Sequence, residues 1–329
     1  MERRSFLTTL FSGSLGLGFY RFGAPSLLKE KYDQKLSFTF EDNKVTYYLK
    51  GLPGPLRIIQ ISDTHLWRDD ARGEPFREYK ARMEKAYNVT KHFKSGAETN
   101  PEQSFEEVLR YAVSTKADLI VLSGDIFSFP SEAAIEWAYE KLIQTGIPFL
   151  YVAGNHDWHY EGMKGSLQEL RSSWTKQRLM KMYQGNDPLM ASYDLKGTKI
   201  MVIDNSVFDI MPEQLEFFRK QKKDGIPFMV FMHIPMYIPG KKSGIGDPSW
   251  GAAMDKGYET EKRERWREGG HIKSTFDFWD ELFASENLLG IFAGHFHRQY
   301  VDVMNGIPHF VAAANAMGAF TEINLVQVK

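Results

Sequence analysis

Five short apolar runs in this chain end in residues that can bind metal ions. The runs are residues 56–62, 118–123, 148–153, 227–232 and 288–293. The segments that follow them are Asp63-Thr64-His65, Gly124-Asp125, Gly154-Asn155-His156-Asp157, His233-Ile234-Pro235 and Gly294-His295-Phe296-His297. Asp, Asn and His supply oxygen and nitrogen ligands, which Mn, Fe, Zn, Ni and Co ions accept. We therefore expect the five segments to share a metal site.

The apolar runs alternate with helical patterns, which predicts how the segments converge. Another apolar run covers residues 200–204, and the helical patterns cover residues 102–115, 131–145, 164–182, 212–223 and 274–285. This alternation predicts βαβ units with buried, largely parallel strands. Because ligand sites in open α/β sheets form at the carboxyl ends of such strands, the five segments should meet there.

Both ends of the predicted domain consist of strands. Residues 36–49 predict a hairpin with a turn near Asp42-Asn43. The last strands are expected at residues 299–303, 308–312 and 320–329. Their succession suggests a second, more antiparallel sheet.

Composition excludes several classes of protein. The 329 residues contain no Cys, which excludes disulfides, thiolate metal sites and a Cys nucleophile. Lys and Arg total 41 against 42 for Asp and Glu, a net charge of -1. This balance argues against a protein that wraps nucleic acid by neutralising phosphates. A hydrophobic content of 43% is typical of a globular protein.

The first residues are similar to an export signal. Arg3-Arg4-Ser5-Phe6-Leu7 resembles the twin-arginine signal of bacteria, and we expect residues 1–24 to be that signal. The following apolar stretch is too short and polar for a membrane span, which takes about 20 apolar residues. The alternative is an ordinary N-terminal amphipathic helix. With the signal, the protein is expected to be exported to the periplasm or cell envelope.

Residues 36–329 are expected to form a single domain with two insertions. The insertion at about 67–101 carries apolar residues at a spacing that suits an amphipathic helix, namely Phe76, Tyr79, Met83, Tyr87 and Phe93. The insertion at about 239–272 is rich in Gly and charge and contains Trp250 and Trp266. It is either a lid or pocket wall, or a solvated insertion.

Alone, most of the metal-ligand segments are weak signals. Gly294-His295-Phe296-His297 is a moderate signal, and Gly154-Asn155-His156-Asp157 is a strong one. Together and in this order, the segments resemble the calcineurin-like metallophosphoesterase superfamily, whose pattern is D-x-H, G-D, G-N-H-[DE], a single His and G-H-x-H. The resemblance covers about residues 56–299. It implies an α/β fold in which two mixed β-sheets pack as an α/β/β/α sandwich. It also implies hydrolysis of a phosphate ester by two divalent or trivalent metal ions.

The resemblance also implies a role for each residue of the pattern. One metal ion would be held by Asp63, His65, Asp125 and His297. The other would be held by Asp125, Asn155, His233 and His295. Asp125 would bridge the ions, which would share a hydroxide as nucleophile. His156 would be the catalytic acid that protonates or stabilises the leaving oxygen, and Asp157 would orient its ring.

The substrate is less defined than the reaction. A small organic phosphodiester, such as a nucleotide or a lipid head-group, is slightly favoured. Aromatic residues near the site loops can stack on a nucleobase or line an apolar leaving-group pocket. The candidate substrate contacts are Arg298, Trp67, Trp158 and His159. The alternatives are a phosphomonoesterase acting on protein or small molecules and, more remotely, a metal-binding protein without catalysis. No membrane span is expected, and the oligomeric state is left open.

One position departs from related patterns. Purple acid phosphatases resemble this pattern but carry a Tyr ligand three residues after the bridging Asp. In many other members that residue is Asp. Here it is Ser128, so we expect no tyrosinate colour and a different contact at this position.

Overall fold

The computed structural model describes residues 37–87, 90–239 and 271–328. The predicted signal at 1–24 and most of the insertion at 239–272, including Trp250 and Trp266, lie outside these ranges. Within them, no helix combines the length and apolar character that a membrane span needs. All the described residues belong to one compact unit.

One six-stranded sheet holds both ends of the described chain. Its strand order is β1-β2-β14-β3-β6-β7. The strands are β1 (Phe38–Glu41), β2 (Lys44–Lys50), β3 (Leu56–Ile61), β6 (Leu119–Ser123), β7 (Phe149–Val152) and β14 (Thr321–Val328). β3, β6 and β7 are parallel to one another, whereas β14 is antiparallel to β3. The predicted hairpin is confirmed as β1–β2, with Asp42 at a φ of 52° in its turn.

The other six-stranded sheet has the order β12-β13-β11-β10-β9-β8. Its strands are β8 (Met190–Leu195), β9 (Thr198–Ile203), β10 (Phe228–Phe231), β11 (Leu288–Ala293), β12 (Tyr300–Met304) and β13 (Ile307–Val311). β9, β10, β11 and β13 are parallel, and β8 and β12 are antiparallel edge strands. The expected mixed sheets are confirmed.

Two details of the predicted strands are wrong. The final strand, β14, does not join the second sheet with β12 and β13 but lies between β2 and β3 of the first sheet. Sequence patterns give the existence of a strand but not its partner, which depends on packing across the whole sheet. The antiparallel edge strand β8 was not predicted, because only one of its residues, Ala191, is fully buried and its apolar signal is weak.

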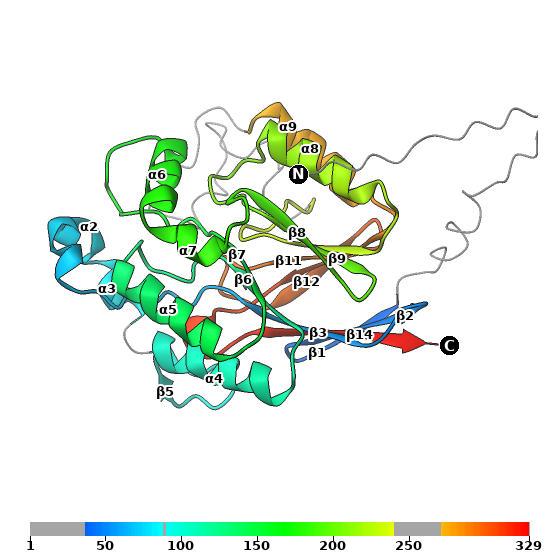
Figure 1. Cartoon of the computed structure of the whole chain (residues 1–329), viewed down its shortest axis with the longest axis horizontal. Coiled ribbons are helices and arrows are strands. Elements are labelled where there is room, and N and C mark those ends of the chain that lie inside the picture. Colours follow the sequence, from blue (N-terminus) through cyan, green and yellow to red (C-terminus); the bar gives the residue numbers. More distant parts are fainter. Residues whose placement is uncertain (1–36, 88–89, 240–270, 329) are drawn as a thin grey trace, which may run out of the picture. The chain divides into compact units, whose positions relative to one another are not determined.

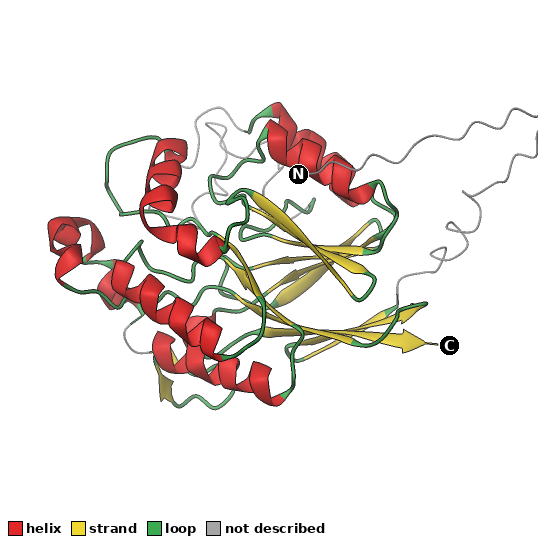
Figure 2. Cartoon of the chain, in the orientation of Figure 1, coloured by secondary structure: helices red, strands yellow, loops and turns green. Residues whose placement is uncertain are grey.

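The two sheets face each other, with helices outside both (Figures 1 and 2). Ile58 of β3 points into the core between the sheets, and its neighbour Ile59 points into the outer core under the helices. Met229 and Val230 of β10 divide in the same way between the inner core and the second outer core. Strands buried on both faces explain the continuous apolar runs, and the predicted α/β/β/α sandwich is confirmed.

Some of the helices begin at residues whose side chains cap them. They are α4 (Pro101–Ser114), α5 (Glu132–Gln144), α6 (Leu167–Trp174), α7 (Met180–Tyr183), α8 (Pro212–Lys222) and α9 (Lys273–Phe283). The Asn100 side chain accepts from Gln103 N–H at 3.0 Å to cap α4, and Ser166 forms a capping box at α6. A π-helical segment, η2 (Thr175–Leu179), joins α6 to α7.

The insertion at 67–101 is not one long amphipathic helix, as its spacing suggested. It forms the short helical turns η1 (Ala71–Phe76), α2 (Arg77–Lys80) and α3 (Met83–Ala86), followed by the strands β4 (Thr90–Lys91) and β5 (Glu98–Thr99). Pro75 lies within η1 and limits its extension. Met83 is nevertheless buried, and the partly buried Phe76, Tyr79 and Tyr87 pack against the same core. The insertion is therefore part of the packed domain.

Candidate metal centre

The metal-ligand segments follow strands of both sheets. Asp63-Thr64-His65 follows β3, Asp125 follows β6 and Asn155 follows β7, all in the first sheet. His233 follows β10, and the pair His295 and His297 follows β11, in the second sheet. The carboxyl ends of these parallel strands meet at one edge of the sandwich, which brings residues more than 230 positions apart into contact.

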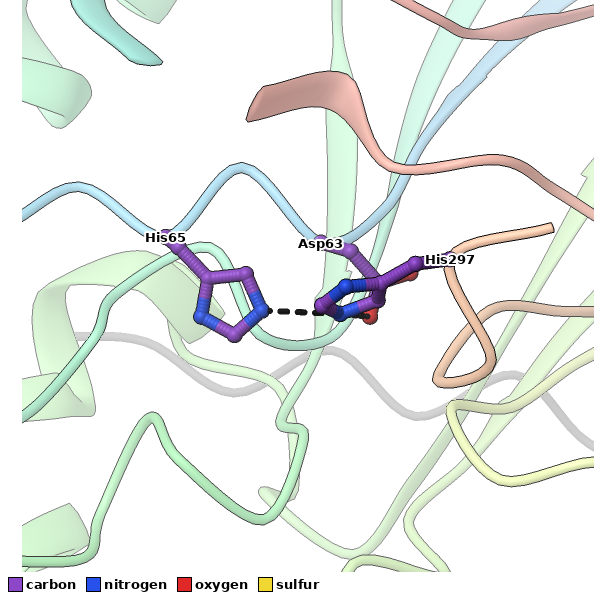
Figure 3. Close-up of side chains that lie close together, drawn as sticks. All are labelled: Asp63, His65 and His297. Carbon is purple, nitrogen blue, oxygen red and sulfur yellow. Dashed lines mark hydrogen bonds and ion pairs between the residues drawn. The ribbon is translucent and has the colours of Figure 1, made fainter. Parts of the chain in front are cut away.

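One ligand cluster consists of Asp63, His65 and His297, whose ligand atoms all lie within 4.8 Å of one another. The two histidine Nε2 atoms are 3.1 Å apart, and His297 Nε2 lies 3.3 Å from Asp63 Oδ1. Figure 3 shows the rings of His65 and His297 pointing toward each other beside the Asp63 carboxylate. Asp63 is fully buried, so its charge needs a cationic partner.

The other ligand cluster consists of Asp125, His233 and His295, again within 4.8 Å. His233 Nε2 lies 3.0 Å from Asp125 Oδ2 and 3.3 Å from His295 Nδ1. The other ring nitrogen of His233, Nδ1, lies 3.0 Å from the Ser123 carbonyl oxygen. That carbonyl accepts a hydrogen bond from Nδ1–H, which leaves Nε2 to bind a metal ion.

The residues of both clusters fit metal ions. Asn155 is buried, and its side-chain oxygen has no hydrogen-bond partner among the described residues. Buried oxygens without a partner are rare, and a metal ion would satisfy this one. His and carboxylate ligands without sulfur suit Mn, Fe, Zn, Ni or Co ions. The predicted division into two ligand groups agrees with the two clusters, whereas the bridging role of Asp125 stays a prediction.

The electrostatics of the two clusters favour cations. Burial alone would raise the pKa of Asp63, but the His297 and His233 rings lower it to about 2. Burial alone would lower the pKa of His233, but the Asp125 carboxylate raises it to about 10. Burial lowers the pKa of His295 to about 3. The carboxylates of Asp63 and Asp125 therefore keep their negative charge, and they attract metal ions as well as protons.

The ligand loops have a strained backbone. Five ligand residues have positive φ angles: Asp63 (56°), His65 (54°), Asp125 (50°), His295 (73°) and His297 (54°). Non-glycine residues adopt this region at a cost of about 1–3 kcal/mol each, and such residues cluster at functional sites. Gly124, with a φ of 87°, makes room for the ligands, because a Cβ there would lie 2.5 Å from His233 Nδ1.

Hydrogen bonds from several elements hold the strained loop of Asp63. Both Asp63 carboxylate oxygens accept from His295 N–H at 3.0 Å. The 3₁₀ turn η4 (Asn315–Met317) donates from Asn315 N–H to Ser62 C=O and from Ala316 N–H to Asp63 C=O. The C-terminal part of the chain therefore positions a ligand near the start of the domain, a role that the sequence did not reveal.

Ser128 supports the same loop. Its hydroxyl donates to the His65 carbonyl oxygen at 3.0 Å. The position that carries Tyr or Asp in related patterns is thus occupied here by a residue that fixes the backbone of a ligand.

With this geometry established, comparison with known proteins identifies the family. A family model described as calcineurin-like phosphoesterase matches residues 56–299, which is most of the chain. The chain belongs to the calcineurin-like phosphoesterase family. Membership makes the protein a hydrolase and confirms the family predicted from the sequence.

Curated relatives from bacteria match most of the calcineurin-like phosphoesterase domain. A probable cyclic nucleotide phosphodiesterase of Psychrobacter sp. (strain PRwf-1) is 23% identical over 286 residues, covering 77% of this chain and 74% of the relative. A similarly named protein of Fibrobacter succinogenes is 24% identical over 246 residues, covering 74% of this chain and 73% of the relative.

A solved structure of a dimetal phosphatase from Danio rerio has a similar fold. Its TM-score is 0.51 at 11% sequence identity, and the match covers 81% of this chain and 91% of that chain. The similarity supports the sandwich architecture of this calcineurin-like phosphoesterase.

Asp157 organises the loops that carry the ligands. Its Oδ2 accepts from Asp125 N–H at 2.9 Å and Gly154 N–H at 2.7 Å, and its Oδ1 accepts from Phe127 N–H at 2.7 Å. Burial and the Asp125 carboxylate raise the pKa of Asp157 to about 7, against these hydrogen bonds. We therefore regard Asp157 as a positioning residue, and its predicted orientation of the His156 ring stays a prediction.

His156 lies beside the ligands. Its ring is half-buried and its centroid is 5.3 Å from that of His65, in an edge-on arrangement. Its backbone N–H donates to Asp125 Oδ1 at 2.8 Å. The predicted catalytic side chain is therefore adjacent to the metal centre.

Tyr87 is a site residue that the sequence analysis missed. Its ring stacks on the His65 ring, with centroids 4.2 Å apart and an interplanar angle of 8°, and it also lies 5.7 Å from the His297 ring. Tyr87 was recognised only as an apolar position of the insertion. Its approach to His65 depends on the path of the short helical turns, which no local pattern reveals.

The candidate substrate contacts differ in their exposure. Trp158 is 1% exposed, and its Nε1 donates to Ser206 Oγ at 2.8 Å. It is a core residue, so the prediction that it stacks on a substrate is wrong. His159 is buried beside it, and Trp67 is 36% exposed. Arg298 is exposed and makes no hydrogen bond or ion pair with the described residues. For these three residues, substrate contact stays a prediction.

Proposed function

We propose that this protein hydrolyses a phosphodiester with two metal ions, and that cyclic nucleotides are its substrate class. The observation that carries the proposal is the pair of ligand clusters at one edge of the sandwich, three acidic or imidazole side chains in each. The names of the relatives from Psychrobacter and Fibrobacter support a cyclic diester. Their identities of 23% and 24% leave the substrate itself to experiment.

The chain's own residues define what the site does to a substrate. Metal ions bound at the two clusters would activate water and polarise the phosphoryl group. Asp63 and Asp125 are the two acidic ligands, and the remaining ligands are neutral when they bind metal. Two divalent ions therefore leave a positive excess that attracts an anionic ester.

His156 is placed to handle the leaving group. Its side chain borders the clusters, and its backbone is fixed to the Asp125 carboxylate. A protonated imidazole there can donate a proton to the leaving oxygen. Such general acid catalysis typically raises the rate by about 10²–10⁴-fold. The neighbouring Asp157 holds the loop backbone at Asp125 and Gly154, which keeps His156 at a constant distance from the ligands.

A phosphomonoester is the second candidate substrate. Arg298 directly follows the ligand His297 and is exposed without a hydrogen-bond partner among the described residues. A guanidinium in this position can pair with the second charge of a monoester. The charge of the ester therefore decides between the two candidates.

The twin-arginine-like start supports the further proposal that the protein is exported to the periplasm or cell envelope. That pathway carries folded proteins, which suits a metal centre assembled from both sheets. Fractionation of a bacterial host that expresses the full chain tests this, with Arg3→Lys/Arg4→Lys as the variant that should retain the protein in the cytoplasm.

The substrate is tested by comparing esters on the metal-loaded full chain. We expect hydrolysis of 3′,5′-cyclic AMP and of bis(p-nitrophenyl) phosphate to exceed that of p-nitrophenyl phosphate. A preference for p-nitrophenyl phosphate that disappears in Arg298→Gln would support the monoesterase instead. Hydrolysis of the chromogenic diester without that of cyclic AMP would reject the cyclic nucleotide and keep the diesterase.

A further inference from the structure

A pocket of about 280 Å³ lies apart from the metal centre, between the α6–η2–α7 helical segment and the end of β9. None of its lining residues is a predicted metal ligand. Arg171, Asp204 and the exposed Lys176 supply its charged groups, and Met180, Pro188 and Leu189 supply an apolar side. Since one water occupies about 30 Å³ in the liquid, the pocket has room for a small organic molecule.

Each of two buried charged groups in this pocket has one side-chain atom without a hydrogen bond among the described residues. Arg171 is 7% exposed and Asp204 is 1% exposed, with Arg171 Nη1 3.5 Å from Asp204 Oδ1. Arg171 Nη1 and Asp204 Oδ2 are both buried, and neither has a hydrogen-bond partner in the described part of the chain. Such atoms are expensive to leave unsatisfied in a protein interior, so a ligand that pairs with them is favoured.

The helix beside these groups is also unusual. The segment Thr175–Leu179 is π-helical, and the buried Thr175 lines the pocket. π-helical segments are rare and occur frequently at functional sites. Both the unpartnered groups and the backbone geometry therefore point to the same pocket.

We propose that this pocket binds a small aliphatic α-amino acid in its zwitterionic form. Arg171 would pair with the carboxylate, and Asp204 Oδ2 would accept from the ammonium group. The two protein groups are adjacent, so the ligand's opposite charges must also be adjacent, as they are across the single Cα of an amino acid. An aliphatic side chain would then lie against Met180 and Leu189.

The pocket is linked to the loop of the catalytic histidine. The Ser206 hydroxyl donates to Asp204 Oδ1 at 2.6 Å and accepts from Trp158 Nε1 at 2.8 Å. Trp158 lies two positions after His156 in the chain. A ligand bound to Asp204 therefore contacts a residue that, through Ser206 and Trp158, helps to fix the loop that carries His156.

The proposal is tested by titrating the full chain with L-leucine, using isothermal titration calorimetry and saturation-transfer NMR. The probes 4-methylpentanoate and isopentylamine are controls that lack the amine and the carboxylate. We expect saturable binding of L-leucine with a Kd on the order of 1 mM or tighter, and at least about tenfold weaker binding of both controls.

Two matched variants locate the binding without breaking the buried ion pair. Ser172 is exposed and lines the pocket, whereas its exposed neighbour Ser173 does not. Ser172→Trp should fill the pocket and abolish L-leucine binding, and Ser173→Trp should preserve it. Absence of saturable L-leucine binding by the unaltered chain overturns the proposal. Equal binding of 4-methylpentanoate, or full binding by Ser172→Trp, also overturns it.

Discussion

Replacing Asp157 by Asn separates two possible roles of this residue. Asp157 accepts three hydrogen bonds from backbone N–H groups, two on Oδ2 and one on Oδ1. An Asn side chain keeps one accepting oxygen and presents an NH₂ group in place of the other. If that oxygen stays with Asp125 and Gly154, the Phe127 N–H faces a donor and loses its partner.

The magnitude follows from these bonds. Losing a hydrogen bond to a charged group costs about 1.5–3 kcal/mol, and leaving the Phe127 N–H buried and unpaired costs about 1–3 kcal/mol more. We therefore expect Asp157→Asn to lower the free energy of unfolding by about 2.5–6 kcal/mol when metal ions neutralise Asp125. In chelator the loss should be smaller, because removing the Asp157 charge also relieves its repulsion with Asp125.

Urea unfolding with Mn²⁺ and with EDTA measures both losses. The control is Asp194→Asn, at an exposed strand residue whose side chain makes no hydrogen bond with the described residues. That control should change stability by less than about 0.5 kcal/mol. Turnover of Asp157→Asn should recover at high Mn²⁺, since the variant loosens the ligand loops. Unchanged stability together with a turnover loss that metal does not restore would refute this reasoning and assign Asp157 to the orientation of His156.

Three further predictions concern the site. His156→Ala should lose about 10²-fold or more in kcat and keep its bound metal, as measured by elemental analysis. Loss of bound metal would contradict the place of His156 outside the ligand set. Tyr87→Ala should weaken Mn²⁺ binding by about 2–10-fold, because it removes an aromatic contact with His65. Tyr87→Phe keeps the ring and should leave Mn²⁺ binding unchanged. Equal affinities of both variants and the parent would show that Tyr87 is not part of the site. Although burial lowers the pKa of His233, Asp125 raises it to about 10, so Mn²⁺ must displace a proton and its affinity should rise roughly tenfold per pH unit below that value. A pH-independent affinity between pH 6 and 8 would contradict this protonation.

The metal centre was predictable because its residues follow strand ends in a fixed order. Parallel strands bring their carboxyl ends together, so the position of a ligand such as Asp63 or His233 follows from the apolar run before it. The two clusters of the structure contain six of the seven predicted ligands, and the seventh, Asn155, is buried in the adjoining loop with an unpaired oxygen.

Other features depend on long-range packing and escaped the sequence. The position of β14 between β2 and β3 and the stacking of Tyr87 on His65 both arise from the global fold. Trp158 lies next to the catalytic segment in sequence, yet its indole turns into the core and bonds to Ser206. Proximity in sequence to a site residue therefore did not predict proximity to the substrate.

The central claim is that two metal ions, one at each ligand cluster, are required for hydrolysis. Its most direct test is a titration of the chelated full chain with Mn²⁺, Fe²⁺, Zn²⁺, Ni²⁺ and Co²⁺ in turn. Bound metal and hydrolysis of bis(p-nitrophenyl) phosphate are recorded at each step. With at least one of these metals, we expect activity to appear as the second ion binds. The variant Asp125→Ala should neither bind two ions nor become active. Full activity in chelator, or with a single bound ion, would contradict the claim.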